Sequence, residues 1–165
     1  MALNAHVSRL TAMSQLKLKI VTPERIVFEG TVDSVTAMTK NGEITVLPNH
    51  IPLATLLRAG EMRLMNGKSE TLLAASTGLL EVRPGNEIVV LAQTAERSEE
   101  LELAAIEEAK KRAEQALVEA KSKDAISFAD AAAHMERELA RYRVAVKHKH
   151  RRGPMEKTAK GLRVE

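Results

Sequence analysis

The first half of the chain alternates hydrophobic and polar residues with the period of β-strands. In residues 15–21, QLKLKIV, the two leucines and the isoleucine fall on one face and the two lysines on the other. This is the pattern of a half-buried strand. The segments RIVFEGTVDSVTAM, EITVL and EIVVLA are also rich in strand-forming residues. We therefore predict a compact antiparallel β domain over residues 14–93.

Short turn motifs separate these segments at intervals of about 7 to 11 residues, which is typical of an all-β sandwich or barrel. Asn41-Gly42 predicts a hairpin with a type I′ turn, which requires positive φ at both central residues. The other expected turns are Glu29-Gly30, Ala59-Gly60, Asn66-Gly67, Thr77-Gly78 and the segment from Arg83 to Asn86.

The second half changes to a composition rich in Ala, Glu, Lys and Arg, which favours helices. We expect Ser98 to cap a first helix that runs to Lys121. Three glutamates follow Ser98 in the first turn, where the helix dipole favours acidic side chains. Ser127 and Asp130 resemble a capping box that opens a second helix, and this helix is expected to end near residues 146–147.

Alanines make up a large part of the faces that these two helices are expected to bury, four of seven residues on the first and two of six on the second. The stripe on the first helix comprises Leu103, Ile106, Ala109, Ala113, Ala116, Leu117 and Ala120. The stripe on the second helix comprises Phe128, Ala131, Ala132, Met135, Leu139 and Tyr142. Each alanine in place of a leucine gives up roughly 2 kcal/mol of burial, so the hairpin is expected to be weakly held and movable. A thin hairpin that never moves fits the pattern equally well.

These patterns together predict an α+β protein with an N-terminal antiparallel β-sandwich followed by a C-terminal antiparallel two-helix hairpin. The expected division is an N-terminal extension over residues 1–13, a β-sandwich over 14–93, a hairpin over 94–147 and a basic, disordered tail over 148–165.

The net charge of +3 is unevenly distributed, since residues 131–165 carry ten basic and four acidic side chains. Such a basic arm suits an acidic partner. Only 2% of the residues are aromatic, and basic residues without interleaved aromatics argue against a single-strand nucleic-acid binder.

Candidate chemistry is sparse. The chain has no cysteine, and it contains no phosphate-binding loop, nucleophile elbow or zinc-protease motif. His50 lies between Pro48 and Pro52 without a ligand or catalytic partner near it in the sequence. The prolines fix φ and remove two backbone donors, which favours a stiff edge. We interpret His50 as a contact residue and expect neither enzymatic activity nor a bound metal.

Three motifs and the order of the elements resemble the epsilon subunit of F-type ATP synthases, called delta in mitochondria. NGEITVLPNHIPL, residues 41–53, is similar to the family's Gly-Glu-Leu and Pro-x-His-x-Pro-Leu stretch. STGLLEVRPGNEIVVLAQTAER, residues 76–97, resembles its Gly-Gly-x-Leu-Glu-Val-x-Pro block, with Thr77 in place of one glycine. LKLKIVTPERIVFEG fits the usual start of the fold. The resemblance covers residues 14–146.

The resemblance implies a non-catalytic rotor subunit in the central stalk, coupling the gamma subunit to the c-ring. By the same resemblance, Glu43 lies at the c-ring loops and His50 at the gamma subunit. The C-terminal helices are implied to extend toward the catalytic alpha/beta ring and to restrain ATP hydrolysis. The implied location is peripheral, on the cytoplasmic face of the inner (plasma) membrane, and bacterial rather than organellar.

The second helix supplies candidates for docking on an acidic surface of the catalytic ring, namely Arg137, Arg141, Arg143 and Lys147. Exposed ion pairs contribute only about 0–1 kcal/mol each, so docking requires the cluster rather than one residue. A solvated charged face explains these residues equally well.

Some bacterial family members bind regulatory ATP through Ile/Leu-Asp-x-x-Arg-Ala and two second-helix arginines. Here Glu102 replaces the aspartate and Ala105 replaces the arginine, while Arg137 and Arg141 match the second helix. Alanine cannot imitate the planar, multi-donor guanidinium. We therefore expect no cofactor and no tight ATP binding, and keep Glu102 and the two arginines as weak candidates.

Two other functions fit the residues alone: a free-standing β-sandwich adaptor whose hairpin binds a partner protein, and an anion- or nucleotide-binding regulatory module. Co-purification with gamma and the alpha/beta ring separates them from the stalk subunit. The tail 148–165 is open to two further roles, a longer inhibitory reach or contact with anionic headgroups.

Overall fold

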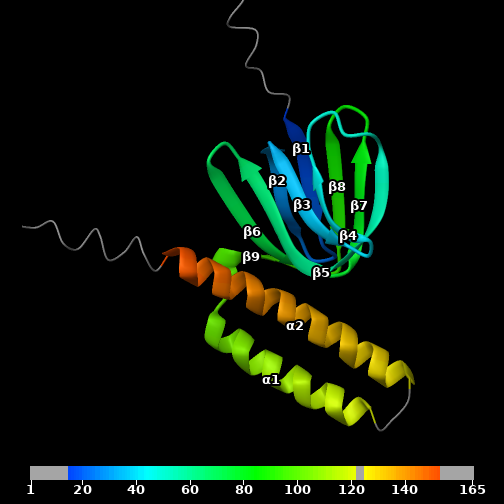
Figure 1. Cartoon of the computed structure of the whole chain (residues 1–165), viewed down its shortest axis with the longest axis vertical. Coiled ribbons are helices and arrows are strands. Elements are labelled where there is room, and N and C mark those ends of the chain that lie inside the picture. Colours follow the sequence, from blue (N-terminus) through cyan, green and yellow to red (C-terminus); the bar gives the residue numbers. More distant parts are fainter. Residues whose placement is uncertain (1–14, 122–124, 153–165) are drawn as a thin grey trace, which may run out of the picture.

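The structure is a computed structural model that describes residues 15–121 and 125–152. Within these residues, the alternating segments of the first half form nine strands. The strands are β1 (Leu16–Val21), β2 (Ile26–Val32), β3 (Ser34–Thr39), β4 (Gly42–Val46), β5 (Leu53–Asn66), β6 (Ser69–Ala75), β7 (Gly78–Arg83), β8 (Glu87–Ala92) and β9 (Ala95–Arg97). They fold into a sandwich above the two helices (Figure 1). The predicted α+β class is confirmed. The short strand β9 was not predicted.

The long strand β5 joins the two layers of the sandwich. Its first part pairs with β7, from Leu53 opposite Val82 to Leu57 opposite Gly78, and its second part pairs with β6 and β3. The turn expected at Ala59-Gly60 is wrong, because β5 continues through it. A Cβ on Gly60 would lie 2.9 Å from Cβ of Met38, so glycine here permits the two strands to approach.

Two other turn predictions are corrected. β2 runs through Glu29-Gly30, and the chain turns instead at Asp33. The hairpin at Asn41-Gly42 is confirmed, but its type I′ geometry is wrong: the central residues are Lys40 and Asn41, neither has positive φ, and Gly42 follows with φ 118°. The Thr39 hydroxyl stabilises this turn with two hydrogen bonds. It accepts from the Asn41 amide at 3.1 Å and donates to the Gly42 carbonyl at 2.8 Å.

The sandwich encloses an aliphatic core, as expected for a chain with few aromatics. The side chains pointing inward are less than 2% exposed at the centre; they include Leu16, Ile20, Val35, Leu64, Leu73, Leu80, Ile88 and Val90. In β1 and β8 every second residue is buried, so the alternation seen in the sequence corresponds to the inward-facing side chains of the strands.

The first helix, α1 (Leu103–Ala120), begins later than predicted. Ser98 does not cap it. Instead, Ser98 is buried and opens a short 3-10 turn over Ser98–Glu100. Leu101 and Glu102 are extended, with ψ 112° and 114°, so the helix cannot start before Leu103. The glutamates expected in its first turn precede it.

The second helix, α2 (Ala125–Arg152), is longer than predicted at both ends. It begins two residues before Ser127, so the expected capping-box start is wrong. It also continues five residues past Lys147, so the first part of the segment expected to be disordered is helical. No glycine or proline interrupts the sequence before Gly153, and Lys147 and Arg151 form ion pairs with the β domain. Residues 1–13 and 153–165 of the expected extension and tail lie outside the described residues.

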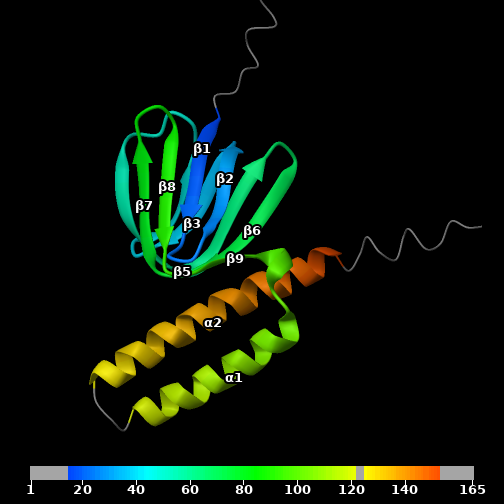
Figure 2. The ribbon, with the colours of Figure 1, turned by 180° about the vertical axis from the view of Figure 1, so that it is seen from behind.

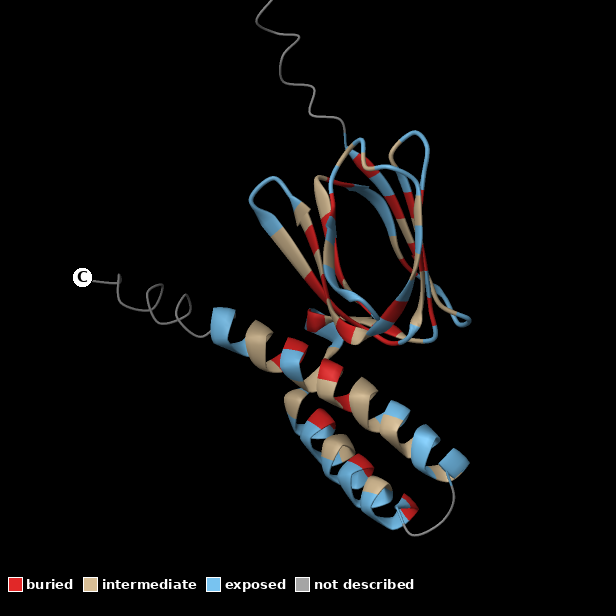
Figure 3. Ribbon diagram, turned by 45° about the vertical axis from the view of Figure 1, so that its right-hand side comes forward, coloured by how far each residue is buried: buried red, intermediate tan, exposed pale blue. Residues whose placement is uncertain are grey.

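The α2 helix lies between the β domain and α1, as Figures 1 and 2 show from opposite sides. The predicted stripe on α1 is confirmed at Ile106, Ala113 and Ala120, but Ala116 is exposed. On α2, Phe128 is exposed, and the deeply buried residues are instead Glu138, Ala140, Val144 and Ala145. The buried colour of Figure 3 is accordingly concentrated in the strands and thin along the helices.

Candidate functional site

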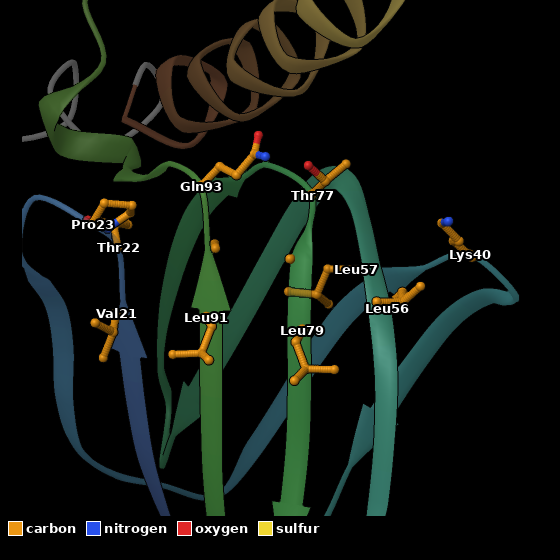
Figure 4. A pocket seen from close by; sticks show the side chains of 12 residues that line it. Val21, Thr22, Pro23, Lys40, Leu56, Leu57, Thr77, Leu79, Leu91 and Gln93 are labelled. Carbon is orange, nitrogen blue, oxygen red and sulfur yellow. The ribbon is translucent and has the colours of Figure 1, made fainter.

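An exposed row of apolar side chains crosses the outer face of strands β1, β8, β7 and β5. The pairing register places Val21 opposite Leu91, Leu91 opposite Leu79, and Leu79 opposite Leu56. Figure 4 shows these four side chains next to one another. They line an open groove of about 720 Å³. We call these four residues the apolar row.

A glycine at the edge of this groove is required by its packing. A Cβ on Gly78 would lie 2.0 Å from the Leu91 carbonyl oxygen, which no side chain can tolerate. Its neighbour Thr77, which replaces a glycine of the family motif, also lines the groove. The close approach of β7 and β8 at this point sets the position of Leu79 beside Leu91.

Sequence reasoning missed the apolar row, although a signal was present. Apolar residues occur in succession as Leu56-Leu57, Leu79-Leu80 and Val90-Leu91. Successive apolar residues in a strand indicate that both faces of the sheet are covered. In this structure the inner member of each pair is buried, while Leu56 and Leu91 remain about half exposed, at 51% and 48%.

The loop that carries His50 is held rigidly at the end of the sandwich farthest from the helices. Asn49 has φ 65°, and its amide donates to the Asn86 side-chain oxygen at 2.6 Å. The His50 amide donates to the Leu47 carbonyl at 3.2 Å, and its Nδ1 lies 2.7 Å from the Ile51 carbonyl. Leu47 and Ile51 beside it are strongly exposed, Ile51 at 74%. The loop thus presents two apolar side chains on either side of a partly buried histidine.

Glu43 lies on the edge strand β4 and is exposed, but it is not free. The Arg63 Nη2 donates to its carboxylate at 2.8 Å. Arg63 Nε also lies 3.5 Å from Glu61, whose carboxylate accepts from Lys147 of α2 at 2.6 Å. A chain of ion pairs therefore connects Glu43 to the second helix.

The four basic candidates on α2 are separated rather than brought together. Arg141 is partly buried between Glu138, at 2.9 Å, and Glu96 of β9, at 3.0 Å. Lys147 is paired with Glu61. Arg143 is exposed, and no ion pair involves Arg137 or Arg143 within the described residues.

Burial on its own would lower the pKa of Arg141, but the charges of Glu96 and Glu138 and their hydrogen bonds outweigh it and raise the pKa above its usual value. This guanidinium therefore stays charged, with its Nη1 and Nη2 groups donating to two carboxylates.

The residues considered for regulatory ATP are not joined to one another by hydrogen bonds or ion pairs in the described chain. Glu102 is exposed and precedes α1 without a side-chain capping bond. No hydrogen bond or ion pair in the described chain links it to Arg137 or Arg141, and Arg141 is already occupied. Likewise, across residues 15–121 and 125–152 no three His, Asp or Glu side chains gather to hold a metal ion.

No helix among the described residues has the length and apolar character needed to cross a membrane. The surfaces that remain for a functional role are the apolar row, the His50 loop, Glu43 and the separate basic residues of α2.

Comparison with known proteins agrees with the motifs. Residues 15–98 match the family model described as the ATP synthase Delta/Epsilon chain, beta-sandwich domain. The ATP synthase epsilon chain of Dehalococcoides mccartyi is 45% identical over 137 residues, which cover 83% of this chain and 96% of that protein. That of Halalkalibacterium halodurans is 39% identical over 133 residues, covering 81% and 98%.

Among solved structures, the fold is similar to a chain of the Euglena gracilis mitochondrial ATP synthase in a cryo-EM structure of OSCP, F1 and the c-ring. The TM-score is 0.64 at 19% identity, with 74% of this chain and 76% of that chain covered. This match concerns the fold alone. The family model and the bacterial relatives together go further, and from them it follows that the chain belongs to the delta/epsilon family of ATP synthase subunits, which are not themselves catalytic.

Proposed function

We propose that this protein is a central-stalk subunit that couples the gamma subunit to the c-ring and restrains ATP hydrolysis through its C-terminal helices. The observation that supports the coupling role best is the apolar row, four aligned side chains on the outer face of the sheet, two of which are about half exposed. Covering two half-exposed leucines provides roughly 1 kcal/mol each, which favours a permanent protein partner over solvent.

The gamma subunit is the partner we assign to this face. Pro52 directly precedes β5, and Ala54 and Leu56 are exposed on its first part, so the His50 loop leads directly onto the sheet that carries the apolar row. His50 is proposed as a polar contact at one end of this interface, and its anchored loop would lose little entropy on binding.

Glu43 is the proposed contact with the c-ring loops. It is exposed on an edge strand whose outer backbone groups are unpaired within the described chain. Because Arg63 already neutralises its charge, the contact would be made by the Glu43–Arg63 pair rather than by a lone carboxylate.

The hairpin is the proposed regulatory part, assigned to residues 94–147 from the sequence and extended here to the end of α2. Docking on an acidic surface of the alpha/beta ring would use Arg137, Arg141, Arg143 and Lys147. Arg137 and Arg143 are available in the folded-down state, whereas Arg141 and Lys147 must first leave their carboxylate partners. Through its partners the protein would lie at the cytoplasmic face of a bacterial membrane.

The decisive experiment measures ATP hydrolysis by the assembled enzyme with the full chain and with a chain lacking residues 98–165. Hydrolysis is expected to rise several-fold without the hairpin, and unchanged hydrolysis would contradict the inhibitory role. Coupling is tested separately with Leu91→Arg, which should abolish co-purification with gamma. Val118→Arg, at an exposed apolar residue of α1, is the matched control and should leave binding intact.

A further inference from the structure

The contact between α2 and the β domain is mainly ionic. Its buried apolar part is small, consisting of Val144 packed with Leu72 and Ala74, with Leu101 at its margin. Four ion pairs cross the same boundary: Glu96 with Arg141, Glu61 with Lys147, Glu70 with Arg151, and Glu136 with Arg58.

The acidic and basic partners in these pairs are mostly divided between the β domain and the helix. In three of the four, the carboxylate belongs to the β domain and the cation to α2. Those carboxylates come from three neighbouring strands, β5, β6 and β9, with β6 paired to both of the others. An acidic strip therefore faces a basic helix, over a span of α2 that runs from Arg141 to Arg151.

The pair at Arg141 has the greatest consequence because a buried carboxylate depends on it. The Glu138 side chain is only 6% exposed, and Arg141 donates to it as well as to Glu96. Without the guanidinium, Glu138 would be a buried charge whose only other ion-pair neighbour in the described chain is His134, at 3.8 Å. Uncompensated buried charges are strongly unfavourable, so Arg141 stabilises Glu138 with the same guanidinium that joins α2 to Glu96 of β9.

We propose that these four ion pairs, with Glu138, form an electrostatic latch that holds the hairpin on the β domain without any bound nucleotide. The latch and the proposed docking on the catalytic ring use the same cations, Arg141 and Lys147. If the proposed function holds, the acidic strip competes with the ring for α2, so the folded and docked states exclude each other.

The test uses the free full-length chain and therefore does not depend on the proposed function. The chain has no cysteine, so Ser69→Cys and His150→Cys, both exposed, introduce the only sites for spin labels. Pulsed electron resonance then measures the distances between β6 and α2, and with them the open fraction. Raising NaCl from about 20 to 500 mM, which shortens the screening length several-fold, is expected to increase the open-to-closed ratio by about threefold or more.

Two variants separate the latch from general charge effects. Arg141→Gln is expected to raise the open-to-closed ratio about tenfold. Arg143→Gln removes the same charge from an exposed position on the same helix and should change the ratio little. Equal opening by both variants, or a ratio that does not respond to salt, would overturn the latch.

A charge reversal provides a check that does not involve the buried carboxylate. Arg151→Glu should open the hairpin, and combining it with Glu70→Arg should close it again. Failure of the second substitution to restore closure would also count against the latch. The urea midpoint of the β domain, followed in each variant, establishes that the sandwich remains folded.

Discussion

The interior of the sandwich and the boundary between the sandwich and α2 are built from different interactions. Inside, aliphatic side chains from both layers are fully enclosed. At the boundary, a set of ion pairs accompanies a small apolar cluster of Leu72, Ala74 and Val144, with Leu101 partly buried against it. Burial of apolar area is insensitive to salt and costly to reverse, whereas partly exposed ion pairs are weak and screened. The comparison explains how one chain can combine a rigid platform with a detachable element.

The substitution with the greatest expected effect lies in the core of the sandwich. Leu80→Ala removes a fully enclosed side chain of β7 and should lower the free energy of unfolding by about 2–5 kcal/mol. Urea denaturation of the full chain, followed by circular dichroism, measures it. A loss below about 1 kcal/mol, smaller than a typical cavity cost, would mean that the core is less tightly packed than the structure indicates.

A smaller and more local effect is expected at the boundary. Val144→Ala removes two methyl groups that touch Leu72 and Ala74, which corresponds to about 1–2 kcal/mol at ~0.8 per carbon. Amide hydrogen exchange in α2 should accelerate about tenfold, while exchange in the β core stays unchanged. If both regions accelerate equally, the platform and the hairpin unfold as one unit, and the comparison fails.

The sequence predicted the sandwich better than the boundary with α2, and the reason is physical. Strand periodicity is local, so β1, β8 and the turn from Arg83 to Asn86 followed directly from the pattern. The buried face of α2 did not, because Val144 contacts β6, a strand some seventy residues earlier in the chain. The candidate site divides in the same way: the His50 loop was visible as a motif, while the apolar row needed the register of four strands.

The smallest expected effect concerns a turn of the sandwich at the end opposite the helices. The Gly67 amide donates to Asp33 at 2.5 Å and the Gln15 side chain at 3.2 Å, and both lower the pKa of Asp33, the Gly67 bond more. The carboxylate therefore adds stability above the pKa it has in the unfolded chain, and this contribution is lost as the pH falls through the lower folded value.

Asp33→Asn should accordingly reduce the thermal midpoint slightly at pH 7. The difference from the unaltered chain should begin to shrink near pH 4 and vanish once the pH is below the folded pKa of Asp33. Scanning calorimetry across this range measures the difference. Glu24→Gln, at an exposed acidic residue of the same domain, serves as the control and should change the thermal midpoint little. A difference that persists at pH 2 would assign the effect to shape rather than charge.

Local sequence patterns were enough to predict the β-then-α order of the elements, most of the strands and the family to which the chain belongs. These depend on periodicity, turn residues and motifs that act within a few residues of one another. Two features depend on the tertiary structure. β5 continues through Gly60 instead of ending there, and α2 extends to Arg152, with its cations forming ion pairs to Glu61, Glu70 and Glu96. Each of these outcomes depends on a contact between distant residues, and a contact of that kind forms only once the sandwich has brought its strands together.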